Sequence, residues 1–335
     1  MMHYAFRAMR LNALTTDAHN YMSSHSSSPA PPDTTGTRAR RLKSALGGLL
    51  RIPALNAAMR LAVRPFAGVI PVEQLMRLPV VGTVRVTLPS GAELKLCSDG
   101  RDGIASALYW RGLQAWEPET FRIFDALLPT ANVVLDVGAN SGLFALYAAL
   151  EQPRCRVFAF EPTPISSAGL ARNIEANDVQ NITRSEAAVG DHDGTIDLFV
   201  PPGESLPLGA STLATFRTPG TRLAVAALRL DTFVRQHHVE RVDLVKIDTE
   251  GTEPSVLAGA RELLERDQPW IVCEVLHGLT EAGLHAELDR LGYRYFLITG
   301  RGLQERPRIE GDPTYRDRNW LFATSRRLES VPGLL

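Results

Sequence analysis

Two carboxylates stand at the ends of neighbouring apolar runs, in positions suited to binding a ligand. Asp136 ends the run that begins at Val133, and the turn Gly138-Ala-Asn-Ser-Gly142 and an apolar helical pattern follow. A buried strand, a tight turn and a helix start in this order bring backbone N–H groups close to a ligand. Because the acidic residue just before the turn would repel a pyrophosphate, a cationic ligand is favoured.

The turn lacks the dinucleotide fingerprint. G-x-G-x-x-G would need glycine at positions 140 and 143, which hold Asn140 and Leu143. Glu161 ends the next apolar run, where a carboxylate can accept both hydroxyls of a ribose. NAD sites and S-adenosylmethionine sites share that carboxylate. The absent glycines and Asp136 therefore indicate S-adenosylmethionine, which carries a sulfonium and an ammonium group.

A third acidic segment is V-D-L-V-K-I-D-T-E-G-T-E, residues 242–253. Strand alternation predicts that Lys246 and Asp248 lie on the same side of a strand, near its carboxyl end. Together with Glu250 they could polarise or deprotonate a substrate hydroxyl, although Lys246 and Asp248 could also form a plain ion pair. Glu253 is expected to begin the next helix, where an acidic residue favours the helix dipole.

Other polar residues have two possible interpretations. Asp191 follows the third strand and is a candidate for an adenine pocket, or an ordinary residue of a turn. Glu117 precedes Pro118 and either caps a helix or reaches the cofactor. Glu274 and His277 follow the fifth strand, and His277 could act as a general base. The residues show no strong metal-ligand spacing.

Several motifs in order make the chain similar to one family. The matching segments are E-P-E-T at 117–120, V-L-D-V-G-A-N-S-G-L-F at 134–144, F-E-P-T-P at 160–164, N-I-E-A-N at 173–177, A-A-V-G-D at 187–191, S-T-L at 211–213, L-D-T at 230–232 and K-I-D-T-E-G-T-E at 246–253. Across residues 100–325 the chain resembles the FkbM-type methyltransferases.

The resemblance implies a Rossmann-like class I methyltransferase fold, S-adenosylmethionine as cofactor, and O-methylation of a hydroxyl on a small molecule or glycan. The residues expected at the cofactor are Glu117, Asp136, Gly138, Asn140, Gly142, Glu161 and Asp191. Lys246, Asp248 and Glu250 are expected to be catalytic. The alternatives are N-methylation, an inactive cofactor-binding interaction module and an NAD-dependent oxidoreductase. The intact carboxylates and Lys246 argue against the inactive module, and the missing glycines argue against the oxidoreductase.

The elements that must position these residues alternate between strand and helix. Helices are expected at 118–128, 142–151, 165–176, 252–265 and 280–291, and strands at 132–136, 156–160, 181–188, 242–247, 270–275, 293–298 and 319–324. This alternation predicts a mostly parallel sheet with helices on both faces. The last two strands have no helix between them, so we expect an antiparallel end. The connection before residue 242 is expected to hold strands at 195–200 and 222–228 and a loop over the active site.

The chain divides by composition into three parts. Residues 1–40 are expected to be a disordered arm, residues 41–101 a helical segment and a β-hairpin, and residues 102–335 the methyltransferase domain. The helical segment is either a cap on the domain or a basic amphipathic surface for a membrane or partner. Met9 and Met22 leave the translation start open.

Composition narrows the class of protein. The 335 residues carry a net charge of −1, which argues against a nucleic-acid partner. The three cysteines are far apart, so neither a disulfide scaffold nor a cysteine zinc site is expected, and a reducing cytoplasm is favoured. No apolar run reaches the length of a membrane span, so no stable membrane insertion is expected. The oligomeric state stays open.

Overall fold

The computed structural model describes residues 47–200, 211–212 and 221–334. The arm expected at residues 1–40 and most of the loop expected over the active site lie outside these ranges. Among the described helices, none has the length and apolar character needed to span a bilayer.

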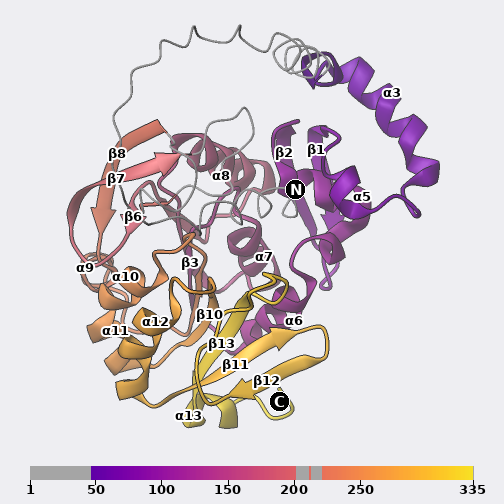
Figure 1. Ribbon diagram of the computed structural model, residues 1–335. Helices are drawn as coiled ribbons and strands as arrows, with labels where there is room; N and C mark the ends of the chain where they lie inside the picture. The colour runs from indigo at the N-terminus through magenta and orange to yellow at the C-terminus, as the bar shows by residue number, and fades with distance from the viewer. Residues whose placement is uncertain (1–46, 201–210, 213–220, 335) are drawn as a thin grey trace, which may run out of the picture.

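An eight-stranded sheet forms the centre of the molecule (Figure 1). Its order is β12 (Gly302–Arg306), β11 (Tyr293–Thr299), β13 (Asn319–Thr324), β10 (Trp270–Glu274), β9 (Leu244–Ile247), β3 (Val133–Val137), β4 (Arg156–Phe160) and β5 (Ile182–Ser185). The five strands from β10 to β5 are parallel, and β13 runs antiparallel to both β10 and β11. The strand order changes direction between β3 and β9, where open α/β sheets bind their ligands. The predicted Rossmann-like class I methyltransferase fold is therefore confirmed.

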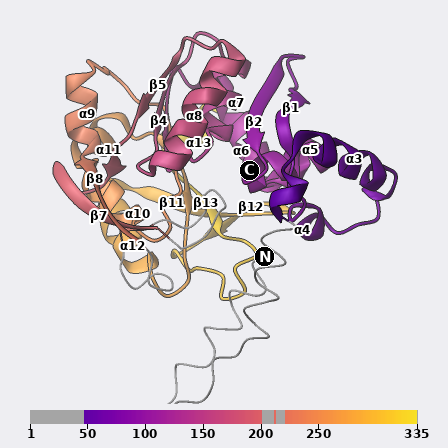
Figure 2. The same ribbon diagram turned by 90° about the horizontal axis from the view of Figure 1, so that it is seen from above.

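Helices cover both faces of the sheet, as predicted. One face carries α5 (Gly103–Arg111), α6 (Pro118–Leu127), α7 (Leu143–Glu151) and α8 (Pro164–Asn177). The other carries α9 (Leu230–Gln236), α10 (Glu253–Ala258), α11 (Arg261–Asp267) and α12 (Glu281–Leu288). Figure 2 shows α9 and α11 on the opposite side of the molecule from α5 and the N-terminal elements. Two apolar cores, one on each face, result from this arrangement.

The predicted hairpin forms a separate two-stranded sheet, β1 (Val81–Thr87) and β2 (Glu93–Asp99). Two asparagines of α8 bind its edge. Asn173 Oδ1 accepts from the N–H of Cys97 at 2.7 Å, and Asn177 bonds both the N–H and the C=O of Lys95. Asn173 also donates to the carbonyl of Ser141 in the turn after β3. The N-I-E-A-N motif therefore ties the hairpin, α8 and the ligand-binding turn together.

The predicted helical segment includes α3 (Pro53–Val63), a 3-10 turn (Arg64–Phe66) and α4 (Val72–Leu75), which prolines divide into short pieces. Asn56 of α3 is fully buried. Its amide bonds the carbonyls of Leu50 and Pro79 and the N–H of Val81. One polar side chain thus anchors α3 to the start of the hairpin.

Six features differ from the prediction. The single helix expected at 252–265 is two helices, α10 and α11, separated at Gly259, where a Cβ would lie 1.9 Å from the carbonyl oxygen of Gly190. The strand expected at 181–188 splits into β5 and β6 (Ala188–Val189). β6 joins β7 (Gly194–Val200) and β8 (Thr221–Leu228) in a separate sheet, and these last two strands were predicted. Helices α5 and α9 and strand β12 were not predicted. The C-terminal helix α13 (Ser325–Glu329) was also missed.

Candidate active site

Polar side chains line one face of the sheet at its carboxyl edge. Asp136 on β3 and Val272 on β10 flank Lys246 on β9 in register, so all three point to the same face. Glu274, the last residue of β10, stands two residues beyond Val272, and Asp248, the first residue after β9, stands two residues beyond Lys246. The predicted pairing of Lys246 with Asp248 is present, with 3.1 Å between Nζ and Oδ2.

One carboxylate oxygen of Asp136 caps a helix, and the other is available to bind a ligand. Its Oδ2 accepts from the N–H of Ala145 in the first turn of α7 at 3.0 Å. Its Oδ1 is buried and has no hydrogen-bond partner among the residues that the structure describes. Burial raises the pKa of Asp136 to about 6, although the nearby Lys246 ammonium opposes the shift. A cationic group at Oδ1 would stabilise the ionised form.

The two glycines of the turn are required by packing. Gly138 has φ +82°, and a Cβ there would lie 1.9 Å from the backbone oxygen of Asp248. Gly142 has φ +89°, and a Cβ there would lie 2.3 Å from Cδ1 of Leu170 on α8. Both positions combine a left-handed backbone with a close approach, which only glycine accommodates. The two glycines therefore allow the turn to pack closely against the loop after β9 and against α8.

Glu161 lies directly beside the turn. Its Oε2 accepts from the N–H of Asn140 at 2.9 Å, and its Oε1 accepts from the backbone N–H and the hydroxyl of Thr163. Asn140 has φ +50°, so this bond fixes a left-handed residue in the middle of the turn. Burial raises the pKa of Glu161, and the bonds from Thr163 and Asn140 oppose that rise. An ionised carboxylate can accept about four hydrogen bonds, which leaves room for a ribose hydroxyl.

Lys246 is buried and remains charged. Its Nζ lies 4.6 Å from the centre of the Phe144 ring. Burial lowers its pKa, but Asp248, Glu117 and Asp136 outweigh that effect and raise the pKa above its ordinary value. For Asp248 burial acts in the opposite direction and raises the pKa, but the positive charges of Lys246 and Arg318 hold the pKa below its ordinary value. The pair is therefore an ammonium and a carboxylate at neutral pH.

Glu117 reaches this edge from α6. It has φ +42° immediately before Pro118, and its side chain does not cap the helix, so the capping interpretation is wrong. Its Oε2 instead accepts from Nδ2 of Asn319, the first residue of β13, at 3.2 Å. Burial raises the pKa of Glu117, and Lys246 opposes this shift. Glu117 therefore faces Lys246 from the helix that covers the sheet.

Sequence reasoning missed one basic residue. Arg318, just before β13, forms an ion pair with Oε1 of Glu274. The second oxygen of Glu274, Oε2, is buried without a hydrogen-bond partner in the described part of the chain. Burial and the neighbouring Asp248 raise the pKa of Glu274 well above its ordinary value. Glu274 could be singled out by its place at a strand end, but no sequence pattern marks Arg318.

Of the other predicted residues, Asp191 and His277 are exposed, and Glu250 is half-buried. Asp191 is 59% exposed and pairs with His192 at 2.8 Å, so the described contacts do not bring it to the turn. Glu250 is half-buried, and its charge acts on Glu274 and Arg318. His277 is half-exposed, and its Nδ1 lies 2.8 Å from the carbonyl oxygen of Gly311.

Glu253 begins α10, as predicted, and also supports the loop after β9. Its carboxylate accepts from the N–H groups of Thr249 and Gly251. Burial raises its pKa to about 7. Across the described ranges, no three His, Cys, Asp or Glu side chains are grouped so that they could hold a metal ion.

Comparisons with known proteins give matches to methyltransferases. Residues 136–295 match the family described as the methyltransferase FkbM domain. The chain is 32% identical to methyltransferase sdnD of Sordaria araneosa over 41% of this chain and 63% of that protein. It is 29% identical to the 31-O-demethyl-FK506 methyltransferase FkbM of Streptomyces tacrolimicus over 55% of this chain and 77% of that one.

A solved structure, the methyltransferase FkbM of Methylobacillus flagellatus KT, is similar with a TM-score of 0.39 and 18% identity, over 57% of this chain and 43% of that chain. The chain spans 63% and 60% of the lengths of the first two curated relatives that it matches. The matched region begins at Asp136 and includes the turn, Glu161 and the Lys246–Asp248 pair. Over residues 136–295 the chain therefore matches the FkbM-type methyltransferase domain.

Proposed function

We propose that the protein is an S-adenosylmethionine-dependent methyltransferase that methylates a hydroxyl group of a small molecule or glycan. The observation that carries this proposal is the contact between the turn after β3 and the loop after β9, at Gly138 and Asp248. This contact supports the proposal, because it joins the turn that carries residues proposed for the cofactor to the loop that carries Asp248, which is proposed for the acceptor.

The chemistry of the turn fits the cofactor. Asp136 Oδ1 is a buried carboxylate oxygen that needs a partner, and a sulfonium-containing amino acid offers a cationic one. The methionine end would be held by Asp136, Gly138, Asn140 and Gly142. Glu161 would accept a hydrogen bond from a ribose hydroxyl. Asp191 at the adenine and Glu117 above the cofactor complete the proposed set.

The acceptor would lie over β9 and β10, next to Asp248 and Glu274. The cofactor supplies a methyl group that is already activated for displacement. The protein's task is then to orient the acceptor hydroxyl and to take up its proton. Asp248, kept ionised by Lys246, is a weak base, so it would orient the O–H group and accept its proton as the new C–O bond forms. Glu250 would add negative charge beside it.

The name of one relative supports a hydroxyl as the acceptor. The Streptomyces relative is named for a substrate that lacks a methyl group on an oxygen, which favours O-methylation here. An amine acceptor is the second possibility. We place the reaction in the cytoplasm, because the cysteines Cys97, Cys155 and Cys273 are all free thiols.

The test is a transfer assay with methyl-labelled S-adenosylmethionine. The purified protein is incubated with a panel of free sugars, oligosaccharides, hydroxylated polyketides and matched amines, and products are identified by mass spectrometry. Label on the oxygen of one acceptor class, lost in Asp248→Asn, supports the proposal. Label on nitrogen would replace it with N-methylation. Cofactor binding without transfer to any acceptor would favour the inactive binding module.

A further inference from the structure

The solvent face of α3 carries no polar side chain. Within α3, Asn56 is buried, and Arg60 lies with its guanidinium carbon 4.9 Å from the centre of the Tyr109 ring. The exposed residues of the helix after its first proline are Ala54, Leu55, Ala58, Leu61 and Ala62. Their spacing of three and four places them on one side of the helix. A contiguous apolar patch on the exposed face of a helix is typical of an interaction site.

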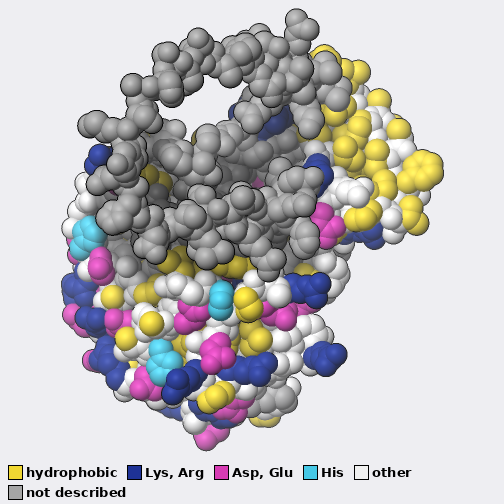
Figure 3. Space-filling model, viewed as in Figure 1, with side chains coloured by type: hydrophobic (Ala, Val, Ile, Leu, Met, Phe, Trp, Pro, Cys, Tyr) yellow, Lys and Arg dark blue, Asp and Glu magenta, His cyan; other side chains and the backbone are white. Residues whose placement is uncertain are grey.

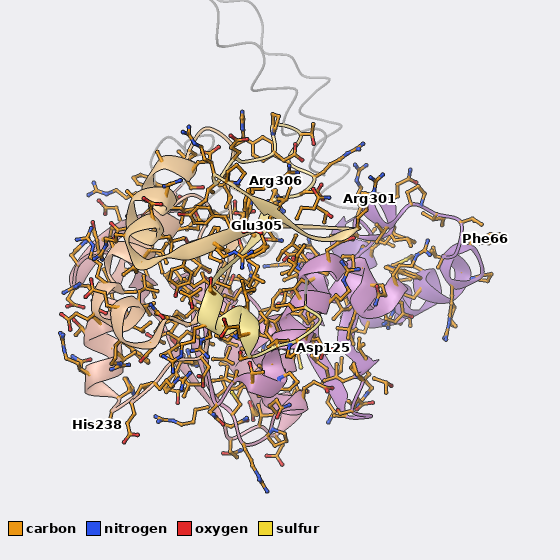
Figure 4. All side chains as sticks on the ribbon, turned by 90° about the horizontal axis from the view of Figure 1, so that it is seen from below. Phe66, Asp125, His238, Arg301, Glu305 and Arg306 are labelled. Atoms are coloured by element: carbon orange, nitrogen blue, oxygen red, sulfur yellow. The ribbon has the colours of Figure 1, made fainter. Side chains whose placement is uncertain are left out.

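The apolar surface continues beyond α3. The large exposed hydrophobic side chains of the described residues, apart from Ile165 and Leu279, are Leu49, Ile52, Leu55, Leu61, Phe66 and Val69. Leu61 is 70% exposed, Phe66 60% and Val69 83%. Figure 3 shows the resulting hydrophobic patch over α3, and Figure 4 shows Phe66 at the outer edge of the molecule, pointing away from it. We name these six residues the α3 patch.

Positive charge surrounds the α3 patch in the sequence. Residues 34–72 contain no Asp or Glu, and their basic residues are Arg38, Arg40, Arg41, Lys43, Arg51, Arg60 and Arg64. The whole chain has a net charge of −1, so the remainder is acidic. Arg64 is exposed and stands between Leu61 and Phe66. Exposed apolar side chains beside a basic cluster are the two features that together hold a protein on an anionic lipid surface.

We propose that the α3 patch binds the surface of an anionic lipid bilayer. Leu61, Phe66 and Val69 would enter the boundary between headgroups and acyl chains, and the arginines would contact the lipid phosphates. A second copy of the chain is the competing occupant. It would bring residues 34–72 of two copies together, each with seven basic and no acidic residues, and like charges disfavour that contact. Charge complementarity therefore favours the bilayer.

The experiment is co-sedimentation of the full chain with large unilamellar vesicles. One set contains phosphatidylcholine alone, and the other contains about 30% phosphatidylserine. We expect binding to the anionic vesicles and little to the neutral ones. Raising the salt concentration from about 0.1 to 0.5 M should weaken binding, because salt screens the attraction between the arginines and the anionic lipids. The double variant Leu61→Ser/Phe66→Ser should reduce the partition coefficient at least about tenfold.

Leu279→Ser is the matched control, because Leu279 is 47% exposed and lies outside the α3 patch. It should bind vesicles as the wild type does, and all variants should keep the wild-type thermal midpoint, since the changed side chains are exposed. The proposal is wrong if the wild type stays in the supernatant with anionic vesicles, or if the double variant binds as well as Leu279→Ser. It is also wrong if sedimentation velocity shows a wild-type dimer that the double variant dissociates, because a second copy then occupies the patch.

Discussion

Gly138 packs against the backbone carbonyl of Asp248 so closely that a Cβ on Gly138 would lie 1.9 Å from the carbonyl oxygen. Gly138 belongs to the turn after β3, and Asp248 to the loop after β9. The contact lies where the strand order of the sheet changes direction. The proposed cofactor site and the proposed acceptor site are therefore in direct packing contact.

Gly138→Ala should destabilise the protein by about 3–5 kcal/mol, because it adds a clash with backbone to a left-handed φ. Gly82→Ala is the control, since Gly82 has φ +104° and nothing within 4 Å of an added Cβ. It should cost only about 1–2 kcal/mol. Urea unfolding of both variants measures the difference. Equal losses would mean that the turn can move away from Asp248.

Asp136→Asn should stabilise the protein at high pH. Burial raises the pKa of Asp136 from 3.8 to about 6 in the folded state, so the folded protein favours the neutral acid. The stability from this group is present below pH of about 4 and is lost as the pH rises through about 6. Asparagine is neutral throughout and avoids that loss.

The unfolding free energy of Asp136→Asn relative to wild type should therefore grow by about 2–3 kcal/mol between pH 4 and pH 8. Chemical denaturation at several pH values tests this, and a difference that does not change with pH would contradict it. The same variant should bind S-adenosylhomocysteine, which keeps the ammonium group, more weakly at pH 8, because the carboxylate is then missing.

Glu161→Gln should weaken S-adenosylhomocysteine binding about 10- to 100-fold, because charge-assisted hydrogen bonds to the ribose are lost. Thr163→Val is the control. It removes one hydrogen bond to the same carboxylate and leaves the charge in place. Calorimetric titration should show near-normal affinity for Thr163→Val, with a stability loss of about 1 kcal/mol. Similar affinities for the two variants would show that Glu161 only supports the turn.

Asp248→Asn should lower turnover by about 10²–10⁴ while cofactor affinity changes little. The substitution keeps the shape of the side chain and removes the charge that pairs with Lys246 at 3.1 Å. Single-turnover kinetics, a cofactor titration and a thermal melt on this variant separate the possible roles. A large loss of cofactor affinity with a normal melt would place Asp248 in the cofactor site. A lower melting point with normal turnover would leave only a structural ion pair.

The sheet and the main carboxylates of the site could be predicted from the sequence, because each of them depends on a local pattern. Apolar runs end in Asp136 and Glu161. Alternation predicts that Lys246 and Asp248 lie on the same side, and in the structure the two side chains form an ion pair. The sheet class follows from alternating strands and helices, and the antiparallel end follows from the missing helix before β13.

The features that could not be predicted from the sequence depend on contacts between distant segments. Arg318 lies in no motif and meets Glu274 only when β13 pairs with β10. Glu117 has the sequence position of a helix cap, but its left-handed backbone directs its side chain to Asn319. The break between α10 and α11 occurs where Gly259 approaches Gly190, which local propensity does not encode.

The central claim is that the turn after β3 binds S-adenosylmethionine and not NAD. Isothermal titration calorimetry of the purified protein with S-adenosylhomocysteine and with NAD, under the same conditions, tests it most directly. We predict saturable one-site binding of S-adenosylhomocysteine that weakens in Glu161→Gln, and no measurable heat with NAD. Measurable NAD binding with none for S-adenosylhomocysteine would contradict the claim.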